Sequence, residues 1–354
     1  MDITHLTARL AESIDPMTDR PFGASVRGLT PVGSTLTVHL HLPYPVGGFD
    51  SELRAAMQPA LVGSPFEHLN FELLADIGVS KATEATQTIG GIKNIIAVSS
   101  GKGGVGKSTT AANLAVALAA QGAKVGLLDA DVYGPSQPLM MGLSDERPTS
   151  VDGKKIIPLK RHGVVVMSIG FLVPKDQPMV WRGPMVTQAL TQLLHDTVWG
   201  ELDYLIVDMP PGTGDTQLTM AQRVPVSGVV IVTTPQEVAV ADAIKGLLMW
   251  QKVSIPILGV VENMSAYHCP ECGHEAALFG QGGGRMLAEA FGLRLLAELP
   301  LMGAIGHETD RGAPIALQAQ TPQGMAFMRL ARKTAAALTT LTQQAFPKIH
   351  IENA

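Results

Sequence analysis

The run GKGGVGKST at residues 101–109 fits a phosphate-binding pattern, in which a glycine-rich turn ends in Gly-Lys followed by Ser or Thr. Glycines let successive backbone N–H groups turn inward and form a concave anion site. In this pattern the lysine places a cation on the outer phosphates of a nucleotide, and the next hydroxyl is free to ligand Mg²⁺. The spacing therefore predicts a nucleoside triphosphate site. The residues expected to line it are Gly101, Lys102, Gly103, Gly104, Val105, Gly106, Lys107, Ser108 and Thr109.

The segments on both sides of this loop suit that use. Residues 94–99 form an apolar run typical of a buried strand, and residues 109–121 have the alanine and leucine content of a helix. A helix N-terminus that faces phosphates stabilises their negative charge. Strand, loop and helix thus follow in the order that phosphate binding requires.

Acidic residues end two further strand-like runs. Asp129 and Asp131 follow the run at 124–128, and Asp208 follows 204–207 in the sequence context of a Walker B aspartate. If the first strand continues, its two carboxylates lie on one face; otherwise one of them is a cap or turn residue. We predict that these acids hold Mg²⁺ and position the attacking water.

Two other segments are assigned less specific roles. Residues 209–215 (MPPGTGD) have little helix or strand preference and suit a switch loop that changes with the bound nucleotide, or an ordinary rigid turn. Asn263 ends another strand-like run and is expected either to present its amide to the nucleotide base or to act as a capping residue.

The two cysteines of the chain, Cys269 and Cys272, lie between His268 and His274. Thiolates in a short Cys-x-x-Cys turn converge easily on one metal. Three interpretations remain open on the residues alone: a single-chain Cys₂His₂ zinc site, a dithiol that cycles with a disulfide, and an iron–sulfur cluster shared between two chains. The third needs a symmetric dimer, because a cubane cluster usually has four thiolate ligands.

The composition describes a globular protein of low surface charge. Hydrophobic residues make up 46% of the 354 positions, charged residues 16%, and the net charge is −5. This balance gives no reason to expect capture of nucleic acid or of an anionic membrane. With no apolar stretch resembling a signal peptide or a bilayer span, we expect a cytoplasmic location.

The chain divides into three parts. Residues 1–80 combine helical and alternating patterns and predict a small α+β domain, and residues 81–91 are small and polar, as in a linker. Residues 92–354 alternate strand-like runs with helical stretches, which predicts an α/β fold, a mainly parallel sheet flanked by helices on both faces. Nucleotide should bind at the carboxyl ends of its strands. The strand-like runs are 94–99, 124–128, 163–169, 204–207, 228–232, 257–261 and 293–296, and 324–344 suits a closing helix.

Several motifs in order resemble those of the Mrp family of ATP-binding iron–sulfur cluster carriers, also called ApbC-like proteins, over most of the chain from about residue 93 to beyond 314. This family belongs to the deviant Walker A P-loop ATPases, with the MinD, ParA and nitrogenase iron proteins. The motifs are the loop with its second lysine, LLDADVYGPS at 127–136, WRGPM at 181–185, VDMPPGTGD at 207–215, TTPQ at 233–236, and VENMS at 261–265 followed by Cys-x-x-Cys.

The resemblance implies specific roles. Lys102 is the signature lysine that reaches phosphates across a dimer interface, and Lys107 and Ser108 serve the phosphates and Mg²⁺. Asp131, with Asp129, polarises water in the first switch, and Asp208 supports Mg²⁺ from the second. The matching roles of Cys269 and Cys272 are those of ligands to a bridging [4Fe-4S] cluster. Residues 1–80 are similar to a small iron–sulfur-assembly domain, although LPYP at 42–45 supplies no thiol where many such domains have one.

The leading hypothesis is therefore a homodimeric cytoplasmic ATPase that binds ATP, Mg²⁺ and a [4Fe-4S] cluster and passes the cluster to apo iron–sulfur proteins, with cluster scaffold proteins as further partners. Slow hydrolysis is expected, because the sequence offers no obvious arginine finger; Arg182 is a candidate. The alternatives are a MinD- or ParA-type positioning ATPase, which needs a basic terminal helix or stripe that residues 348–354 do not offer, and an ATPase with a structural zinc site.

Overall fold

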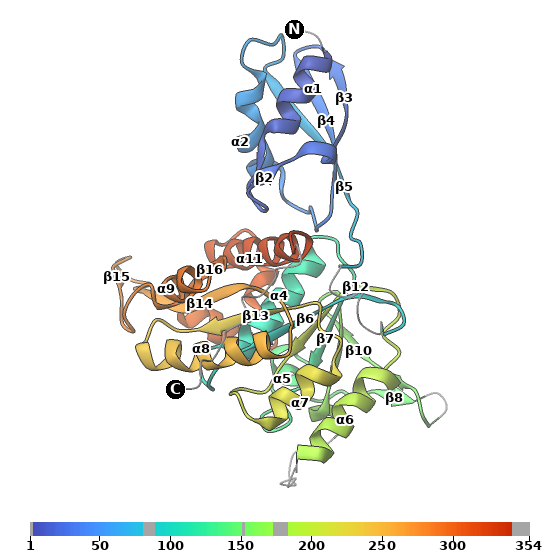
Figure 1. Ribbon diagram of the computed structural model, residues 1–354, viewed down its shortest axis with the longest axis vertical. Helices are drawn as coiled ribbons and strands as arrows, with labels where there is room; N and C mark the ends of the chain where they lie inside the picture. Colours follow the sequence, from blue (N-terminus) through green and yellow to red (C-terminus); the bar gives the residue numbers. More distant parts are fainter. Residues whose placement is uncertain (1–2, 81–88, 151–152, 173–182, 342–354) are drawn as a thin grey trace, which may run out of the picture.

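The computed structural model describes residues 3–80, 89–150, 153–172 and 183–341. Its main body is a nine-stranded sheet in the order β10-β11-β7-β12-β6-β13-β14-β15, with β16 paired to β14 (Figure 1). All pairings among the inner strands and β16 are parallel, whereas β10 and β15 pair antiparallel. The strands are β6 (Ile92–Ser99), β7 (Val125–Asp129), β10 (Leu159–Arg161), β11 (Val164–Ser168), β12 (Leu202–Asp208), β13 (Gly228–Thr233), β14 (Ile257–His268), β15 (Glu275–Ala276) and β16 (Leu295–Leu301).

Helices cover both faces of this sheet, as a parallel sheet requires. The helices α4 and α11 pack together on one face, and α8 packs on β13 and β14 (Figure 1). None of the described helices is long and apolar enough to cross a bilayer. The helices are α4 (Lys107–Ala120), α5 (Gln137–Met140), α6 (Gly183–Asp196), α7 (Asp215–Arg223), α8 (Glu237–Lys252), α9 (Gly283–Ala290), α10 (Gly303–Asp310) and α11 (Pro322–Thr339).

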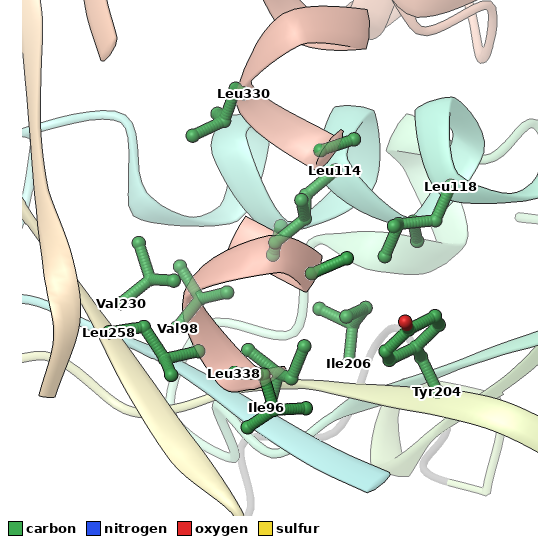
Figure 2. Packing of buried hydrophobic residues seen from close by; sticks show 14 of the residues in the cluster. Ile96, Val98, Leu114, Leu118, Tyr204, Ile206, Val230, Leu258, Leu330 and Leu338 are labelled. Atoms are coloured by element: carbon green, nitrogen blue, oxygen red, sulfur yellow. The ribbon is translucent and has the colours of Figure 1, made fainter. Parts of the chain in front are cut away.

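The core between the sheet and the pair α4 and α11 is continuous and apolar. The alanine-rich sequence of α4 is buried along most of its length, which lets this helix lie close to the strands. Figure 2 shows leucine side chains of α4 and α11 facing branched side chains of the sheet. The labelled residues are Ile96, Val98, Leu114, Leu118, Tyr204, Ile206, Val230, Leu258, Leu330 and Leu338.

These elements confirm the predicted α/β fold with a mainly parallel sheet. Differences occur at element ends. Helix α1 ends at Glu12, so Ile14 does not continue its apolar face but lies exposed in β1. Strand β14 runs seven residues beyond the predicted end at 261 to His268, because pairing with β16 and β15 continues where the apolar run stops.

Residues before the linker form a small sheet of their own, β3-β4-β5, backed by α1 and α2. Strand β4 alternates half-buried and buried positions, in agreement with its sequence pattern. Residues 81–88 of the predicted linker lie outside the described residues. The elements of this leading unit are α1 (Ile3–Glu12), β1 (Ile14–Asp15), β2 (Arg20–Pro21), β3 (Val26–Val32), β4 (Thr35–Leu42), α2 (Asp50–Met57) and β5 (His68–Ala75).

The leading unit contacts the far end of α4. The Gly47 N–H donates to the carbonyl of Gln121, 3.2 Å away, and a Cβ on Gly47 would come within 2.8 Å of the Gln121 Cα, so the contact needs glycine. Arg332 of α11 is 2% exposed; it donates to the Gly47 carbonyl at 2.9 Å and lies over the Phe49 ring, 4.3 Å from its centroid. A buried guanidinium thus joins α11 to the leading unit.

Candidate functional site

The predicted phosphate loop connects β6 to α4 at the carboxyl edge of the sheet. Two of its glycines are required for different reasons. Gly106 caps α4 at φ +84°, and a Cβ there would overlap the side-chain amide of Asn263. Gly101 packs so closely on the backbone of α8 at Asp242 that a Cβ would overlap it. The loop is therefore held by α8 on one side and by β14 on the other.

Lys107 is the cation at the centre of the site. Its side chain is 6% exposed and donates from Nζ to Asp208 Oδ1 and, at 3.2 Å, to Ser108 Oγ. Asp131 Oδ2 lies 3.7 Å from the same Nζ. The ammonium group thus compensates two buried carboxylates. It has to leave this ion pair in order to contact a phosphate.

Asp129 is fully buried next to Asp208 on the neighbouring strand. It accepts hydrogen bonds from the Asp131 N–H at 3.2 Å, and from the Gln137 N–H at 3.1 Å and Ser168 Oγ at 2.9 Å. Burial and the Asp208 charge raise the pKa of Asp129 to about 7. Through its bonds to the backbone N–H groups of Asp131 and Gln137, Asp129 holds the segment between β7 and α5 in place.

Asp131 differs from Asp129 because β7 ends at Asp129. The condition under which the two carboxylates would share one strand face is therefore not met, and Asp131 lies beyond the strand, as in the alternative interpretation. Asp131 keeps 8% of its surface exposed, and burial raises the pKa of its carboxyl while Lys107 opposes the shift. Of the two acids, Asp131 is the one with an accessible carboxylate beside the lysine.

The donor set fits Mg²⁺. A hydroxyl oxygen from Ser108 and carboxylate oxygens from Asp131 and Asp208 gather around Lys107 Nζ, and hard oxygen ligands are those that Mg²⁺ prefers. A Cβ on Gly103 or Gly104 would meet no atom within 4 Å, so no described residue covers the loop at these two glycines. Bound there, Mg²⁺ would neutralise phosphate charge.

Two contributing residues were missed in the sequence. Gln137 donates from Nε2 to Asp208 Oδ2 at 2.9 Å and to the Ser108 carbonyl at 3.0 Å, and Ser168 pairs in register with Asp129. Gln137 directly follows the segment 127–136 that carried the family resemblance. Ser168 is the one polar side chain in the strand-like run 163–169, and that departure from an apolar pattern was the available signal.

Asn263 holds the loop from the side of β14. Its Nδ2 donates to the carbonyl of Val105 at 2.9 Å, next to Gly106. The neighbouring Glu262 is 1% exposed and accepts from Gly282 N–H at 3.4 Å and Gly284 N–H at 2.5 Å, at the start of α9. Strand β14 is therefore fixed to the loop and to α9 at adjacent residues. The expected contact with a nucleotide base remains a prediction.

Lys102, the second lysine of the loop, is half-buried. Its backbone carbonyl accepts from Ser100 Oγ at 2.9 Å. Within the described ranges its ammonium group has no carboxylate within ion-pair distance.

The cysteine pair occupies the turn that joins β14 to β15. The Cys269 N–H donates to the His274 carbonyl and the Gly273 N–H to the Cys269 carbonyl, both at 2.9 Å. Cys269 is half-buried and Cys272 exposed. Hydrogen bonds from the backbone of Cys272, then of Glu271, lower the pKa of the Cys269 thiol, which favours the thiolate that binds metals.

Across the residues that the structure describes, which include all of 268–274, no group of three or more His, Cys, Asp or Glu side chains is placed to hold a metal ion. The single-chain zinc site considered above is therefore not formed in this arrangement. His268 Nδ1 instead lies 3.9 Å from Glu275 Oε2 on the paired strand.

Some expectations fall outside the described residues. They concern Arg182 as arginine finger, the first two residues of the WRGPM motif, and the chain end at 348–354. The switch-like segment 209–215 is described; Gly212 has φ +99°, and its N–H donates to the Ser100 carbonyl at 3.0 Å, which ties the segment to the start of the loop.

Known proteins are similar to this chain over most of its length. Residues 91–335 match the family described as NUBPL iron-transfer P-loop NTPase. The "Iron-sulfur cluster carrier protein" of Haemophilus influenzae is 48% identical over 86% of this chain and 83% of its own. That match is longer than the segment from residue 92 to the chain end, so it includes part of the leading unit.

Two solved structures are similar in fold. A nucleotide-binding protein from Archaeoglobus fulgidus in complex with ADP is 40% identical, with a TM-score of 0.58 over 67% of this chain and 92% of its own. The septum site-determining protein MinD of Pyrococcus horikoshii, in complex with Mg-ADP, is 24% identical, with a TM-score of 0.50 over 67% and 94% of the two chains. The second likeness shows the fold alone.

Proposed function

This chain belongs to the NUBPL iron-transfer P-loop NTPase family, and from that premise we propose that it is a homodimeric ATPase that carries a [4Fe-4S] cluster and passes it to apoproteins. Family membership confirms the resemblance inferred from the sequence motifs. Relatives at about half identity are named iron–sulfur cluster carriers. The proposal adds that the cluster is of the [4Fe-4S] type, that two chains form a dimer around it, and that the cluster is transferred to apoproteins.

The observation that carries the proposal is the course of β14. At Asn263 this strand is bonded to the phosphate loop; it ends at His268, and Cys269 is the next residue, at the start of the turn. The strand is irregular between these points, where Met264 has φ +57° and the pairing with β16 shifts register between Asn263 and Tyr267. One short stretch of chain thus connects the nucleotide site to the thiols that would hold the cluster. A change in the geometry of the phosphate loop on nucleotide exchange can therefore be transmitted through β14 to the cysteine turn.

The count of thiols supports a dimer. Each chain has two cysteines, and a cubane cluster usually takes four thiolates, so two copies of the Cys269 turn have to meet on a twofold axis. Ligands on a turn that is exposed to solvent suit a cargo that has to be released. The recipients are apo iron–sulfur proteins, with scaffold proteins as donors.

In the nucleotide site we assign ATP and Mg²⁺ as ligands and slow hydrolysis as the reaction. Lys107 moves from Asp208 to the phosphates, Ser108 and Asp208 hold Mg²⁺, and Asp131 orients water. Turnover is proposed to be slow because the sequence offers no obvious arginine finger. We place the protein in the cytoplasm, with residues 1–80 as a separate domain and no nucleic acid or membrane partner.

Anaerobic reconstitution tests the carrier function. With iron and sulfide, the purified chain is expected to bind about four irons per dimer and to absorb broadly at roughly 400 nm, as Cys₄-ligated clusters do. Iron, sulfide and zinc are measured on the same sample, and mass is measured by light scattering. Stoichiometric zinc on a monomer that takes up no iron would refute the proposal.

Replacing Lys102 with alanine tests the dimer at the nucleotide site. Because Lys102 has no carboxylate partner among the described residues, its removal is expected to leave ATP binding by one subunit within about twofold. Hydrolysis should fall at least about tenfold, as when a cation supplied in trans is lost. Lys160→Ala, on the exposed edge strand β10, is the matched control. Unimpaired hydrolysis by Lys102→Ala would exclude the cross-subunit role.

A further inference from the structure

Gln137 is a buried polar residue at the junction of three parts of the nucleotide site. It is the first residue of α5 and is 0% exposed. Its backbone N–H donates to Asp129 Oδ2 at 3.1 Å, and its side-chain Nε2 donates to Asp208 Oδ2 at 2.9 Å and to the Ser108 carbonyl at 3.0 Å. One residue thereby connects the ends of β7 and β12 to the phosphate loop.

The orientation of this amide is fixed by its partners. Both the Asp208 carboxylate and the Ser108 carbonyl are acceptors, so only the NH₂ end of the Gln137 side chain can face them. The other end, Oε1, is buried without a hydrogen-bond partner. A buried unpaired carbonyl costs free energy, and an apolar side chain of the same shape would avoid that cost. Packing alone therefore does not explain a glutamine at this position.

The two oxygens of Asp208 are held by two different donors. Lys107 Nζ holds Oδ1 and Gln137 Nε2 holds Oδ2. When Lys107 moves to a phosphate, the first donor is lost. Within the described part of the chain, Gln137 is then the donor that still bonds the Asp208 side chain, and it also bonds the backbone of Ser108, whose hydroxyl would ligand Mg²⁺.

We propose that Gln137 is a positioning residue, which holds Asp208 and Ser108 at the spacing needed for Mg²⁺ while Lys107 transfers from Asp208 to the phosphates. This rests on the nucleotide-hydrolysing function proposed above. Gln137 acts through Asp208 and Ser108 and is not placed in contact with the reacting atoms. Its loss affects the metal-dependent part of nucleotide binding rather than the contacts of the loop with phosphate.

The test uses the full chain with Gln137→Met, which keeps the length of the side chain and removes its donors. Binding of a fluorescent N-methylanthraniloyl-ADP is measured in EDTA and across a Mg²⁺ titration, and hydrolysis is measured over the same titration. In EDTA, affinity is expected to stay within about twofold of the unmodified protein. The Mg²⁺ concentration that half-saturates both binding and hydrolysis is expected to rise about tenfold.

Gln121→Met is the matched control, because Gln121 is also buried, donates from Nε2 to the carbonyls of Ala117 and Met328 at 3.1 and 2.9 Å, and leaves its Oε1 without a partner, but lies at the far end of α4 from the nucleotide site. It should leave the Mg²⁺ titration unchanged. An unchanged titration in Gln137→Met, or an equal shift in Gln121→Met, overturns the proposal. Gln137→Leu repeats the test if the methionine variant does not fold, as judged by thermal unfolding. If the unmodified protein shows no Mg²⁺-dependent nucleotide binding, both this inference and the proposed hydrolysis are refuted. If the titrations behave as expected but the protein binds no iron, the carrier function fails and the role of Gln137 is retained.

Discussion

Lys107→Ala is expected to reduce ATP hydrolysis by roughly 100-fold or more, the usual cost of removing one preorganised electrostatic contact to a developing charge. Lys107 is the cation that the Asp131 and Asp208 carboxylates share in the loop. Steady-state hydrolysis and nucleotide affinity are measured with Lys160→Ala as the surface control. Hydrolysis at the unmodified rate would contradict the assignment of this loop as the phosphate site.

The same variant carries a stability prediction with a definite pH dependence. Without Lys107, the buried Asp129, Asp131 and Asp208 lose their shared counter-charge, and breaking such a pair costs about 3–5 kcal/mol. The pKa of Asp129 is already raised from its usual 3.8 to about 7, so ionising it in the folded protein is unfavourable. In the unmodified protein the Asp129 contribution to stability therefore falls as pH rises between about 4 and 7. In Lys107→Ala this fall extends to higher pH.

Lys107 lowers the pKa of the Asp131 and Asp129 carboxyls, so its loss raises both pKa values further. The deficit in melting temperature of Lys107→Ala, relative to the unmodified protein, is expected to be larger at pH 8 than at pH 6, because protonation at the lower pH relieves the repulsion. Thermal unfolding without nucleotide measures it. A deficit that does not change with pH would mean that the carboxylates are not coupled through this lysine.

Cys269→Ala is expected to abolish cluster binding and to leave nucleotide binding unchanged. The physical reason is the ligand count, since a dimer of this variant keeps two of its four thiolates. Reconstitution followed by iron and sulfide analysis measures the loss, and titration with the fluorescent ADP analogue measures the nucleotide site. The free energy of unfolding should change by less than about 0.5 kcal/mol, because the turn lies outside the core.

The matched control is His274→Ala, whose side chain is exposed on the same turn and whose carbonyl keeps the hydrogen bond to Cys269. It should retain the cluster. If His274→Ala loses the cluster, the His274 imidazole is also a cluster ligand. If Cys269→Ala retains four irons per dimer, Cys269 is not a ligand.

Local patterns in the sequence predicted the parts of the site that depend on neighbouring residues. The strand before the loop, the helix after it and the acid after each apolar run are set by periodicity and by glycine geometry within a few residues. The structure describes β6, α4, β7 and β12 at these places. The carboxyl ends of parallel strands then bring Asp129 and Asp208 side by side.

Residues whose role depends on distant pairing were not predictable in this way. Ser168 meets Asp129 only because β11 pairs with β7, and Gln137 meets Asp208 only because the chain after β7 folds back over β12. Arg332 looks like a solvated charge on an amphipathic helix, and its burial follows from contact with Phe49, far away in sequence. Contacts between residues that are distant in the sequence cannot be predicted from local charge and periodicity.

The division of β14 into two halves has a consequence for how this protein can be altered. Up to Glu262 the strand is buried in the sheet, and from Asn263 onward all but one residue are partly exposed as it extends toward the cysteine turn. The turn with Cys269 and Cys272 therefore lies outside the buried part of the sheet. If this turn holds the proposed cluster, substitutions among its residues can change the ligand set without repacking the core beside the phosphate loop.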